Sequence, residues 1–227
     1  MAFMICWDHI DTVLLDMDGT LLDLYFDNYF WMEFLPQRYA EAKHISLDDA
    51  KTQLFARFSE HRGTLNWYCL DFWRQETGLD IVAMKAEVKD LIGLRPNAIT
   101  FLQKVRESGR KAVLITNAHR GSLDLKLEQI PMAPHFDGIF SSHDFGLPKE
   151  DPHLWSRLQA VMHYEPARTL LIDDSLAVLR SAKKAGIAHT LGVLQPDSQK
   201  QSMDTEEFIG LDCFSRIYPP SAQPDNH

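Results

Sequence analysis

The segment Asp16-Met17-Asp18-Gly19-Thr20 places two carboxylates one residue apart, directly after the short apolar run 12–15. In an extended chain, residues i and i+2 point to the same face, and the glycine that follows allows the two side chains to diverge. One carboxylate can then attack phosphorus while the other serves the leaving oxygen. The pair therefore indicates chemistry on a phosphate ester.

A second acidic pair, Asp173 and Asp174, follows the apolar run 169–172. If it lies beside Asp16 and Asp18, a cluster of three or four carboxylates without basic partners would be strongly self-repelling. A hard cation relieves this repulsion, and a site made only of oxygen ligands suits Mg²⁺, which also bridges to the substrate phosphate. The acids therefore predict a magnesium site.

Groups that can bind phosphate oxygens come from two further segments. Thr116 and Asn117 follow the apolar run 111–115 and offer a hydroxyl and an amide as hydrogen-bond donors. Lys149 lies in the proline-containing loop 146–152, just before a helical pattern. A lysine at this position can neutralise the charge of a phosphoryl group during transfer. We therefore expect these three side chains to contact the substrate phosphate.

Three apolar runs predict the strands that must bring these groups together. Runs 12–15, 111–115 and 169–172 are continuous rather than alternating, as expected for strands covered on both faces of a parallel sheet. Alternating strands and helices predict an α/β fold with a doubly wound parallel sheet, in which the carboxyl ends of the strands meet at one crevice. The helical patterns cover residues 99–108, 154–162 and 175–185.

The stretch from about residue 24 to 92 breaks this rhythm, because it is rich in aromatic residues at helical spacing and contains no apolar run of the same type. We interpret it as an all-helical insertion. The predicted domains are an α/β core over residues 1–22 and 93–218 and a helical cap over residues 23–92. The polar tail 219–227 contains prolines and is expected to be disordered.

Composition narrows the possible partners. The net charge of −9 disfavours nucleic acids and anionic membranes, and no run approaches the ~18 to 20 apolar residues of a membrane span. The three cysteines lie far apart, which favours a reducing compartment. We therefore expect a cytoplasmic monomer or homodimer that acts on a small-molecule phosphomonoester.

The four chemical segments, in this order, resemble the haloacid dehalogenase superfamily of phosphohydrolases. The resemblance spans residues 12 to about 195, and the helical insertion lies where that family carries its cap. The motifs that carry it are Asp16-Met17-Asp18-Gly19-Thr20, Leu114-Ile115-Thr116-Asn117, Lys149 and Ile172-Asp173-Asp174-Ser175.

This resemblance implies a role for each acid. Asp16 would be the nucleophile, and Asp18 would protonate the leaving alkoxide and then activate water against an aspartyl phosphate. Dehalogenating relatives lack the second acid, so Asp18 points to phosphoryl transfer. The metal would be held by the Asp16 carboxylate, the Asp18 main-chain carbonyl and Asp174, with Asp173 binding directly or through a water.

Three segments are similar to the bacterial GMP/IMP 5′-nucleotidase group of this superfamily, namely residues 26–31, 64–71 and 192–198. The similarity implies a purine nucleoside 5′-monophosphate as substrate. In the cap, Tyr29 and Trp67 can stack on a purine base or can pack in the cap core, and Asn28 and Asn66 are polar groups that can meet substrate.

The residues leave several alternatives open. A sugar-phosphate phosphatase or a phosphomutase of the same superfamily would share this active site. A regulatory binding protein on the same fold would need no catalysis, although such a protein can lose Asp16 or Asp18 without consequence and both are present. Accumulation of inorganic phosphate from a single added substrate would exclude a mutase, and phosphate release measured with and without Mg²⁺ would separate an enzyme from a binding protein.

Overall fold

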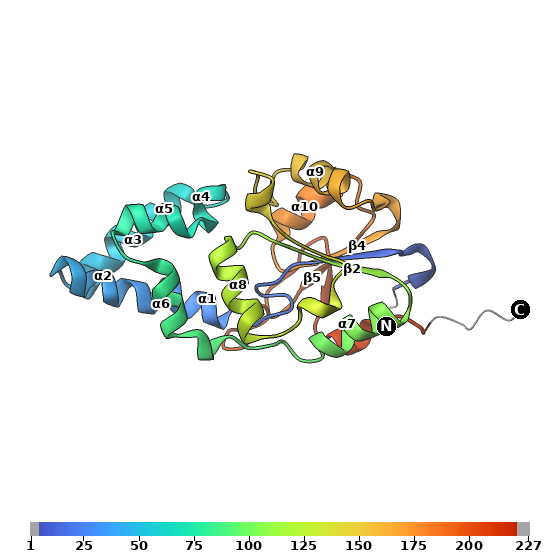
Figure 1. Cartoon of the computed structure of the whole chain (residues 1–227), viewed down its shortest axis with the longest axis horizontal. Helices are drawn as coiled ribbons and strands as arrows, with labels where there is room; N and C mark the ends of the chain where they lie inside the picture. The colour runs from blue at the N-terminus through green and yellow to red at the C-terminus, as the bar shows by residue number, and fades with distance from the viewer. Residues whose placement is uncertain (1–4, 222–227) are drawn as a thin grey trace, which may run out of the picture.

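The computed structural model describes residues 5–221, so positions 222–227 of the predicted disordered tail lie outside the described residues. Its centre is a parallel six-stranded sheet with the strand order β3-β2-β1-β4-β5-β6 (Figure 1). The three predicted apolar runs form its middle strands, which are β1 (Thr12–Leu15), β2 (Lys111–Thr116) and β4 (Thr169–Asp173).

The register brings the ends of these three strands to one level. Leu15, the last residue of β1, pairs with Leu114 of β2 and with Ile172 of β4. The main-chain N–H of Asp16 donates to the carbonyl of Ile172 at 3.0 Å. Asp16, Asp173 and, two residues after Leu114 in β2, Thr116 therefore emerge at the same edge of the sheet.

The remaining three strands were not predicted from the sequence. They are β3 (Gly138–Ser141), β5 (His189–Val193) and β6 (Ile209–Leu211). Each contains a glycine, and β3 and β6 are short edge strands whose side chains are only partly buried. Since one side of an edge strand faces solvent or loops, its residues do not form the continuous apolar run that marks a central strand.

Helices cover both faces of the sheet. One buried cluster joins Val13 and Leu15 of β1 to helices α7 (Ala98–Glu107) and α8 (Arg120–Gln129). The other cluster contains Leu14. It is covered by helices α9 (His153–Val161) and α10 (Leu176–Lys184). Alternate residues of one strand thus face opposite cores, which confirms the doubly wound α/β fold.

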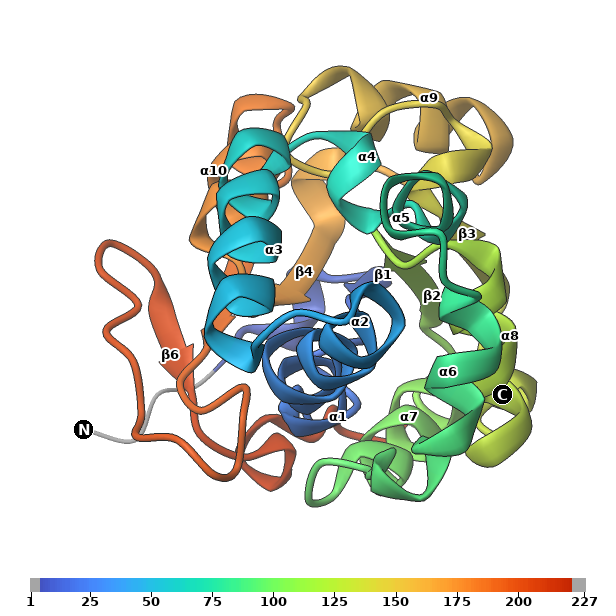
Figure 2. The same cartoon turned by 90° about the vertical axis from the view of Figure 1, so that its left-hand side faces the viewer.

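Between β1 and α7 the chain forms a helical body. Its described residues contain no strand, and Figure 2 shows its helices in front of the sheet. The elements are α1 (Tyr25–Tyr29), a π-helical turn (Phe30–Phe34), α2 (Leu35–Lys43), α3 (Leu47–His61), α4 (Leu65–Tyr68), α5 (Leu70–Thr77), α6 (Ile81–Glu87) and a 3₁₀ turn (Lys89–Leu91). We call this body the cap.

Two chain segments connect the cap to the rest of the molecule, and they are hydrogen-bonded to each other. Leu22 and Leu94 form an isolated antiparallel bridge. The N–H of Asp23 donates to the Gly93 carbonyl at 2.8 Å, and that of Arg95 donates to the Leu21 carbonyl at 2.9 Å. The exact boundaries between core and cap domains stay a prediction.

Short 3₁₀ turns complete the described secondary structure. They cover Trp7–His9, Ala133–His135, Ser142–Asp144, Pro166–Arg168 and Phe214–Ile217. Within residues 5–221, no helix combines the length and the apolar character needed to cross a membrane.

The cap has an aromatic core of its own around Trp73. The Trp73 ring is fully buried and makes edge contacts with the rings of Phe58 and Phe72, with both centroid distances at 5.0 Å. Its indole N–H donates to the Trp67 carbonyl at 2.9 Å. Most aromatic residues of the insertion therefore stabilise the cap, as one of the two sequence-based interpretations expects.

Replacing Trp73 by alanine tests this core. We expect Trp73→Ala to lower the free energy of unfolding by about 3–5 kcal/mol, because it removes a large buried side chain and leaves a cavity. Leu47→Ala, at a largely exposed position of α3, is the control and should cost less than about 1 kcal/mol. Urea denaturation monitored by far-UV circular dichroism measures the free energy of unfolding of both variants. Equal losses in the two variants would contradict the role of Trp73 in the cap core.

Candidate active site

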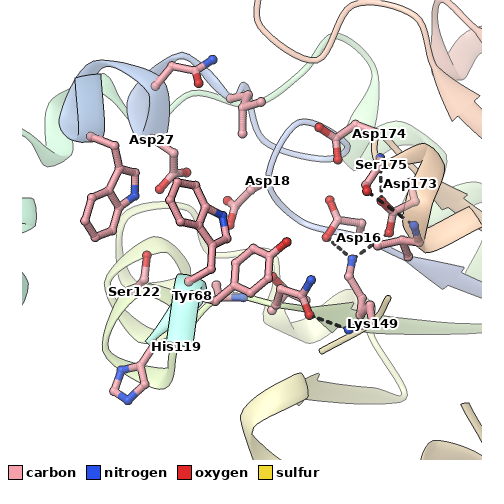
Figure 3. Close-up of a pocket in the computed structure, with 18 of the residues that line it drawn as sticks. Asp16, Asp18, Asp27, Tyr68, His119, Ser122, Lys149, Asp173, Asp174 and Ser175 are labelled. Atoms are coloured by element: carbon pink, nitrogen blue, oxygen red, sulfur yellow. Dashed lines mark hydrogen bonds and ion pairs between the residues drawn. The ribbon is translucent and has the colours of Figure 1, made fainter. Parts of the chain in front are cut away.

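The side chains predicted to do chemistry meet at the carboxyl edge of the sheet (Figure 3). Asp16 directly follows β1, whereas Thr116 and Asp173 are the last residues of β2 and β4. They line one cavity of about 300 Å³ between the sheet and the cap. The same cavity is also lined by Asp18, Asn117, Lys149 and Asp174.

Lys149 joins two of the acids. Its ammonium donates to Asp16 Oδ1 at 2.5 Å and to Asp173 Oδ2 at 2.7 Å, and the side chain is only 2% exposed. Burial alone would lower the pKa of Lys149, but the two carboxylates raise it above its ordinary value. Lys149 therefore stays charged at the point where the strands end.

Burial is also the largest influence on the pKa values of the acids. It raises the pKa of Asp16 to about 6, against the opposing effect of Lys149. Burial also raises the pKa of Asp174 well above its ordinary value, and the charges of Asp16 and Asp173 add to this effect. Within residues 5–221, Asp174 has no basic partner. The site therefore carries negative charge that Lys149 does not fully neutralise.

These acids fit a hard divalent cation. Asp16, Asp173 and Asp174 each offer one carboxylate oxygen, and the three oxygens lie within 4.8 Å of one another. Asp16 Oδ2 is buried and accepts no hydrogen bond from the described part of the chain. An oxygen-only group of this kind suits Mg²⁺. The Asp18 carboxylate does not belong to the group, and the use of its main-chain carbonyl as a ligand stays a prediction.

Asp173 is already engaged at both oxygens. Oδ2 accepts from Lys149, and Oδ1 accepts from the Ser175 N–H at 2.9 Å. Whether Asp173 would bind a cation directly or through a water stays a prediction.

Gly19 allows the first acidic segment to turn close to Asp174. Its φ of +86° lies in the left-handed region, and a Cβ at this position would lie 2.5 Å from Asp174 Oδ2. Any larger residue would therefore strain the backbone and displace a carboxylate of the candidate metal site.

The two groups from the end of β2 have different environments. The Thr116 oxygen accepts a hydrogen bond from the Ala118 N–H at 3.0 Å, so its own hydroxyl proton is available to the cavity. Asn117 uses both ends of its amide within the protein: Oδ1 accepts from the Lys149 N–H at 2.9 Å, and Nδ2 donates to Glu150 at 3.0 Å. Asn117 thus holds the Lys149 loop in this structure, and its contact with substrate stays a prediction.

The acids are not uncompensated, contrary to the sequence-based expectation of a cluster without basic partners. Besides Lys149, the ammonium of Lys126 lies 2.6 Å from Asp18 Oδ1 and 2.6 Å from Asp27 Oδ2. Lys85 donates to Asp27 Oδ1 at 2.6 Å. We call Asp18, Lys126, Asp27 and Lys85 the charged relay.

The pKa values of the two acids in the relay are shifted in opposite directions. Burial raises the pKa of Asp18 to about 6, although Lys126 opposes this effect. For Asp27, burial acts in the same direction, but Lys126 and Lys85 together outweigh it and lower its pKa to about 2. Sequence analysis missed Lys126, Asp27 and Lys85, because charged residues between apolar neighbours resemble solvent-facing positions of a helix.

The four predicted cap residues divide into two groups. Asn28 and Trp67 line the cavity, whereas Tyr29 and Asn66 are not among its lining residues. The Tyr29 ring lies 6.1 Å from that of Tyr25, and Asn66 is exposed. The structure thus brings only Asn28 and Trp67 to the acids.

Polar contacts between cap and core border the cavity. The Tyr68 hydroxyl donates to Glu150 at 2.6 Å, and burial followed by the Glu150 charge raises the pKa of this phenol. Asn28 donates to Asp197 at 2.6 Å. The apolar part of the cavity wall comes mainly from the cap and includes Leu24, Trp31, Met32, Trp67 and Leu70.

A doubly wound sheet with an acidic site at its carboxyl edge and a helical cap over that site defines an α/β protein whose ligand binds in the crevice at the strand ends. The model of the haloacid dehalogenase-like hydrolase family matches residues 10–186. This chain belongs to that family, which confirms the family and the enzyme class predicted from the four motifs.

Individual relatives agree with this assignment. The GMP/IMP nucleotidase YrfG of Escherichia coli (strain K12) is 41% identical over 219 residues, which cover 96% of this chain and 99% of the relative. A crystal structure of a HAD phosphatase from Thermococcus onnurineus has a TM-score of 0.76 at 19% identity, with 91% of this chain and 95% of the other covered. CbbY from Rhodobacter sphaeroides, in complex with phosphate, has a TM-score of 0.65 at 17% identity, with the same coverage. The two structures support the fold.

Gly19→Ala tests the close approach of the acidic turn to Asp174. We expect hydrolase activity to fall about 10²-fold, since small displacements of catalytic groups have effects of this size. Gly63→Ala is the matched control, because Gly63 also has a positive φ, of 78°, but a Cβ there would meet nothing within 4 Å. Both variants should lose stability, and equal activity in the two would contradict the role of the contact.

Proposed function

We propose that this enzyme is a Mg²⁺-dependent phosphomonoesterase that forms an aspartyl phosphate on Asp16 and hydrolyses purine nucleoside 5′-monophosphates such as GMP and IMP. The observation that carries the chemistry is the convergence of Asp16, Asp173 and Lys149 at one edge of the sheet. The support for the substrate is the 41% identity, over nearly the whole chain, to a relative described as a GMP/IMP nucleotidase.

In the first proposed step, a carboxylate oxygen of Asp16 attacks phosphorus and forms an O–P bond. The bond between phosphorus and the ribose 5′ oxygen breaks, and that oxygen takes a proton from Asp18. Lys149 and the Thr116 hydroxyl stabilise the charge on the phosphoryl oxygens. The nucleoside leaves with the proton, and the phosphoryl group stays on Asp16.

In the second proposed step, a water attacks the phosphorus of the aspartyl phosphate and gives a proton to Asp18. The bond between phosphorus and Asp16 breaks, which releases inorganic phosphate and restores both acids to their starting states. Asp16, Asp174 and the Asp18 carbonyl would hold Mg²⁺, with Asp173 as a further ligand or water-mediated partner. The bound cation would supply positive charge toward the phosphate and relieve the repulsion among the acids.

The cap side of the cavity suits an aromatic base. Trp31, Met32, Trp67 and Leu70 form an apolar wall next to the acids. Trp67 is half-buried, and its ring can stack on a purine while its other contacts remain in the cap core. Asn28 would supply a polar contact to the nucleoside. A cytoplasmic location and a monomeric or dimeric state stay predictions.

Asp16→Asn tests the covalent route. We expect turnover to be abolished while the fold is retained, because the amide keeps the shape of the carboxylate but is a poor nucleophile. Thr116→Ala removes one donor to the phosphoryl group and should lower kcat by about 10²–10³-fold. Phosphate release measures both. Activity of Asp16→Asn near the wild-type level would rule out the aspartyl phosphate.

A phosphate-release panel tests the metal and the substrate. We expect release from GMP and IMP in the presence of Mg²⁺ and none after chelation by EDTA, with recovery when Mg²⁺ is added back. Sugar phosphates provide the comparison. Faster release from a sugar phosphate would contradict the nucleotide assignment, whereas conversion to an isomer without phosphate release would identify a phosphomutase. No reaction under any condition would favour a binding protein.

A further inference from the structure

The charged relay runs from Asp18 into the cap, and Asp27 and Lys85 line the cavity together with Asp18. Lys126 belongs to helix α8 of the core and lies between Asp18 and Asp27, with both distances at 2.6 Å. Asp27 belongs to α1, the first cap helix, and its second oxygen lies 2.6 Å from the Lys85 ammonium on α6. Figure 3 shows Asp18 and Asp27 on the same side of the cavity.

The two lysines of the relay are almost completely removed from water, whereas the side chains of Asp18 and Asp27 are 19% and 17% exposed. Lys126 is 1% exposed and Lys85 is 2% exposed. The Lys85 ammonium also lies 4.8 Å from the ring centroids of Phe26 and Phe30, where aromatic faces attract a cation. Apolar side chains of similar volume often stabilise a protein as well as a buried ion pair does. Packing alone therefore does not account for two buried lysines paired in series with two partly buried carboxylates.

The contact with Lys126 gives the two Asp18 carboxylate oxygens different roles. Oδ1 accepts the short hydrogen bond from the ammonium. Asp18 also lines the cavity, and within residues 5–221 its Oδ2 accepts no hydrogen bond, so Oδ2 is the oxygen free to meet the reacting group. A carboxylate held at one oxygen by a charged donor has lost rotational freedom. Lys126 thus selects which Asp18 oxygen faces the reacting group.

The cap supplies the second carboxylate that holds the Lys126 ammonium. One of its two carboxylate partners is in the core and the other is in the cap, and the cap partner is itself held by a second cap helix. Because Lys126 makes its short contacts in both bodies, its position depends on how α1 and α6 lie against α8.

On the basis of the proposed function, we propose that Lys126, Asp27 and Lys85 are positioning residues that hold Asp18 toward the leaving-group oxygen when the cap lies against the core. None of the three exchanges a proton with substrate in this role. They align Asp18, which does exchange a proton. The relay therefore makes acid catalysis at Asp18 depend on the placement of the cap.

Leaving-group dependence distinguishes positioning from a merely structural role. The ribose alkoxide of a nucleotide needs a proton as it departs, whereas p-nitrophenolate is a far weaker base and departs without one. The quantity to compare is kcat/KM, because it covers steps only up to the first irreversible one and excludes later hydrolysis of the aspartyl phosphate. A misaligned Asp18 should therefore slow GMP much more than p-nitrophenyl phosphate.

We expect Lys126→Met to lower kcat/KM for GMP by about 10²-fold, the lower end of what a positioned general acid contributes, with a much smaller loss for p-nitrophenyl phosphate. Asp27→Asn and Lys85→Met should change the ratio in the same direction, with the smaller effect at Lys85, which is farther from Asp18. Asp18→Asn should show the same signature, and adding Lys126→Met to it should change the ratio no further.

Lys51→Met is the control, because Lys51 forms a cap ion pair with Glu33 that does not line the cavity; it should leave the ratio unchanged. If Lys126→Met does not fold, the double variant Lys126→Met/Asp27→Asn, which keeps the net charge of the relay, takes its place. Equal losses for both substrates in folded variants would overturn the positioning role. An active Asp16→Asn enzyme would instead reject the proposed function itself.

Discussion

The buried ammonium of Lys149 is the interaction on which the site depends. It lies within 2.7 Å of carboxylates at the ends of two different strands, and it offsets part of their mutual repulsion at a position where it is almost fully buried. Breaking such a pair would leave an uncompensated buried charge, which is strongly destabilising. The loop that carries Lys149 is held in turn by Asn117, so the ends of β1, β2 and β4 are all tied to one cation.

The centre of the fold and the catalytic edge could be predicted from the sequence because their signals are local. A continuous apolar run identifies a strand buried on both faces, and a polar residue at its end marks the place where the crevice lies. Edge strands such as β6 carry no such signal, since their burial depends on neighbours distant in the chain. The relay was missed for the same reason: nothing near Lys126 in the sequence shows that Asp18 and Asp27 fold onto it.

The cap illustrates how one set of residues can serve two purposes. Trp67 contacts the Trp73 cluster and also lines the cavity, so this one residue packs in the cap core and can meet a ligand, while stacking on a base stays a prediction. Tyr29 and Asn66 lie in the same two helices as Asn28 and Trp67 but do not reach the cavity. A short helix turns consecutive residues about 100° apart, so sequence proximity to a lining residue does not predict contact with the ligand.

The paired connection between cap and core constrains how the molecule can open. Leu22 and Leu94 lie side by side, joined by the hydrogen bonds that Asp23 and Arg95 donate across the bridge, so sliding one connection along the other would break both hydrogen bonds at once. Bending both connections together would break neither of these hydrogen bonds. The bridge therefore keeps the two connections together, so the cap would move relative to the core only by bending at both segments at once, as the shared hinge of a single rigid unit.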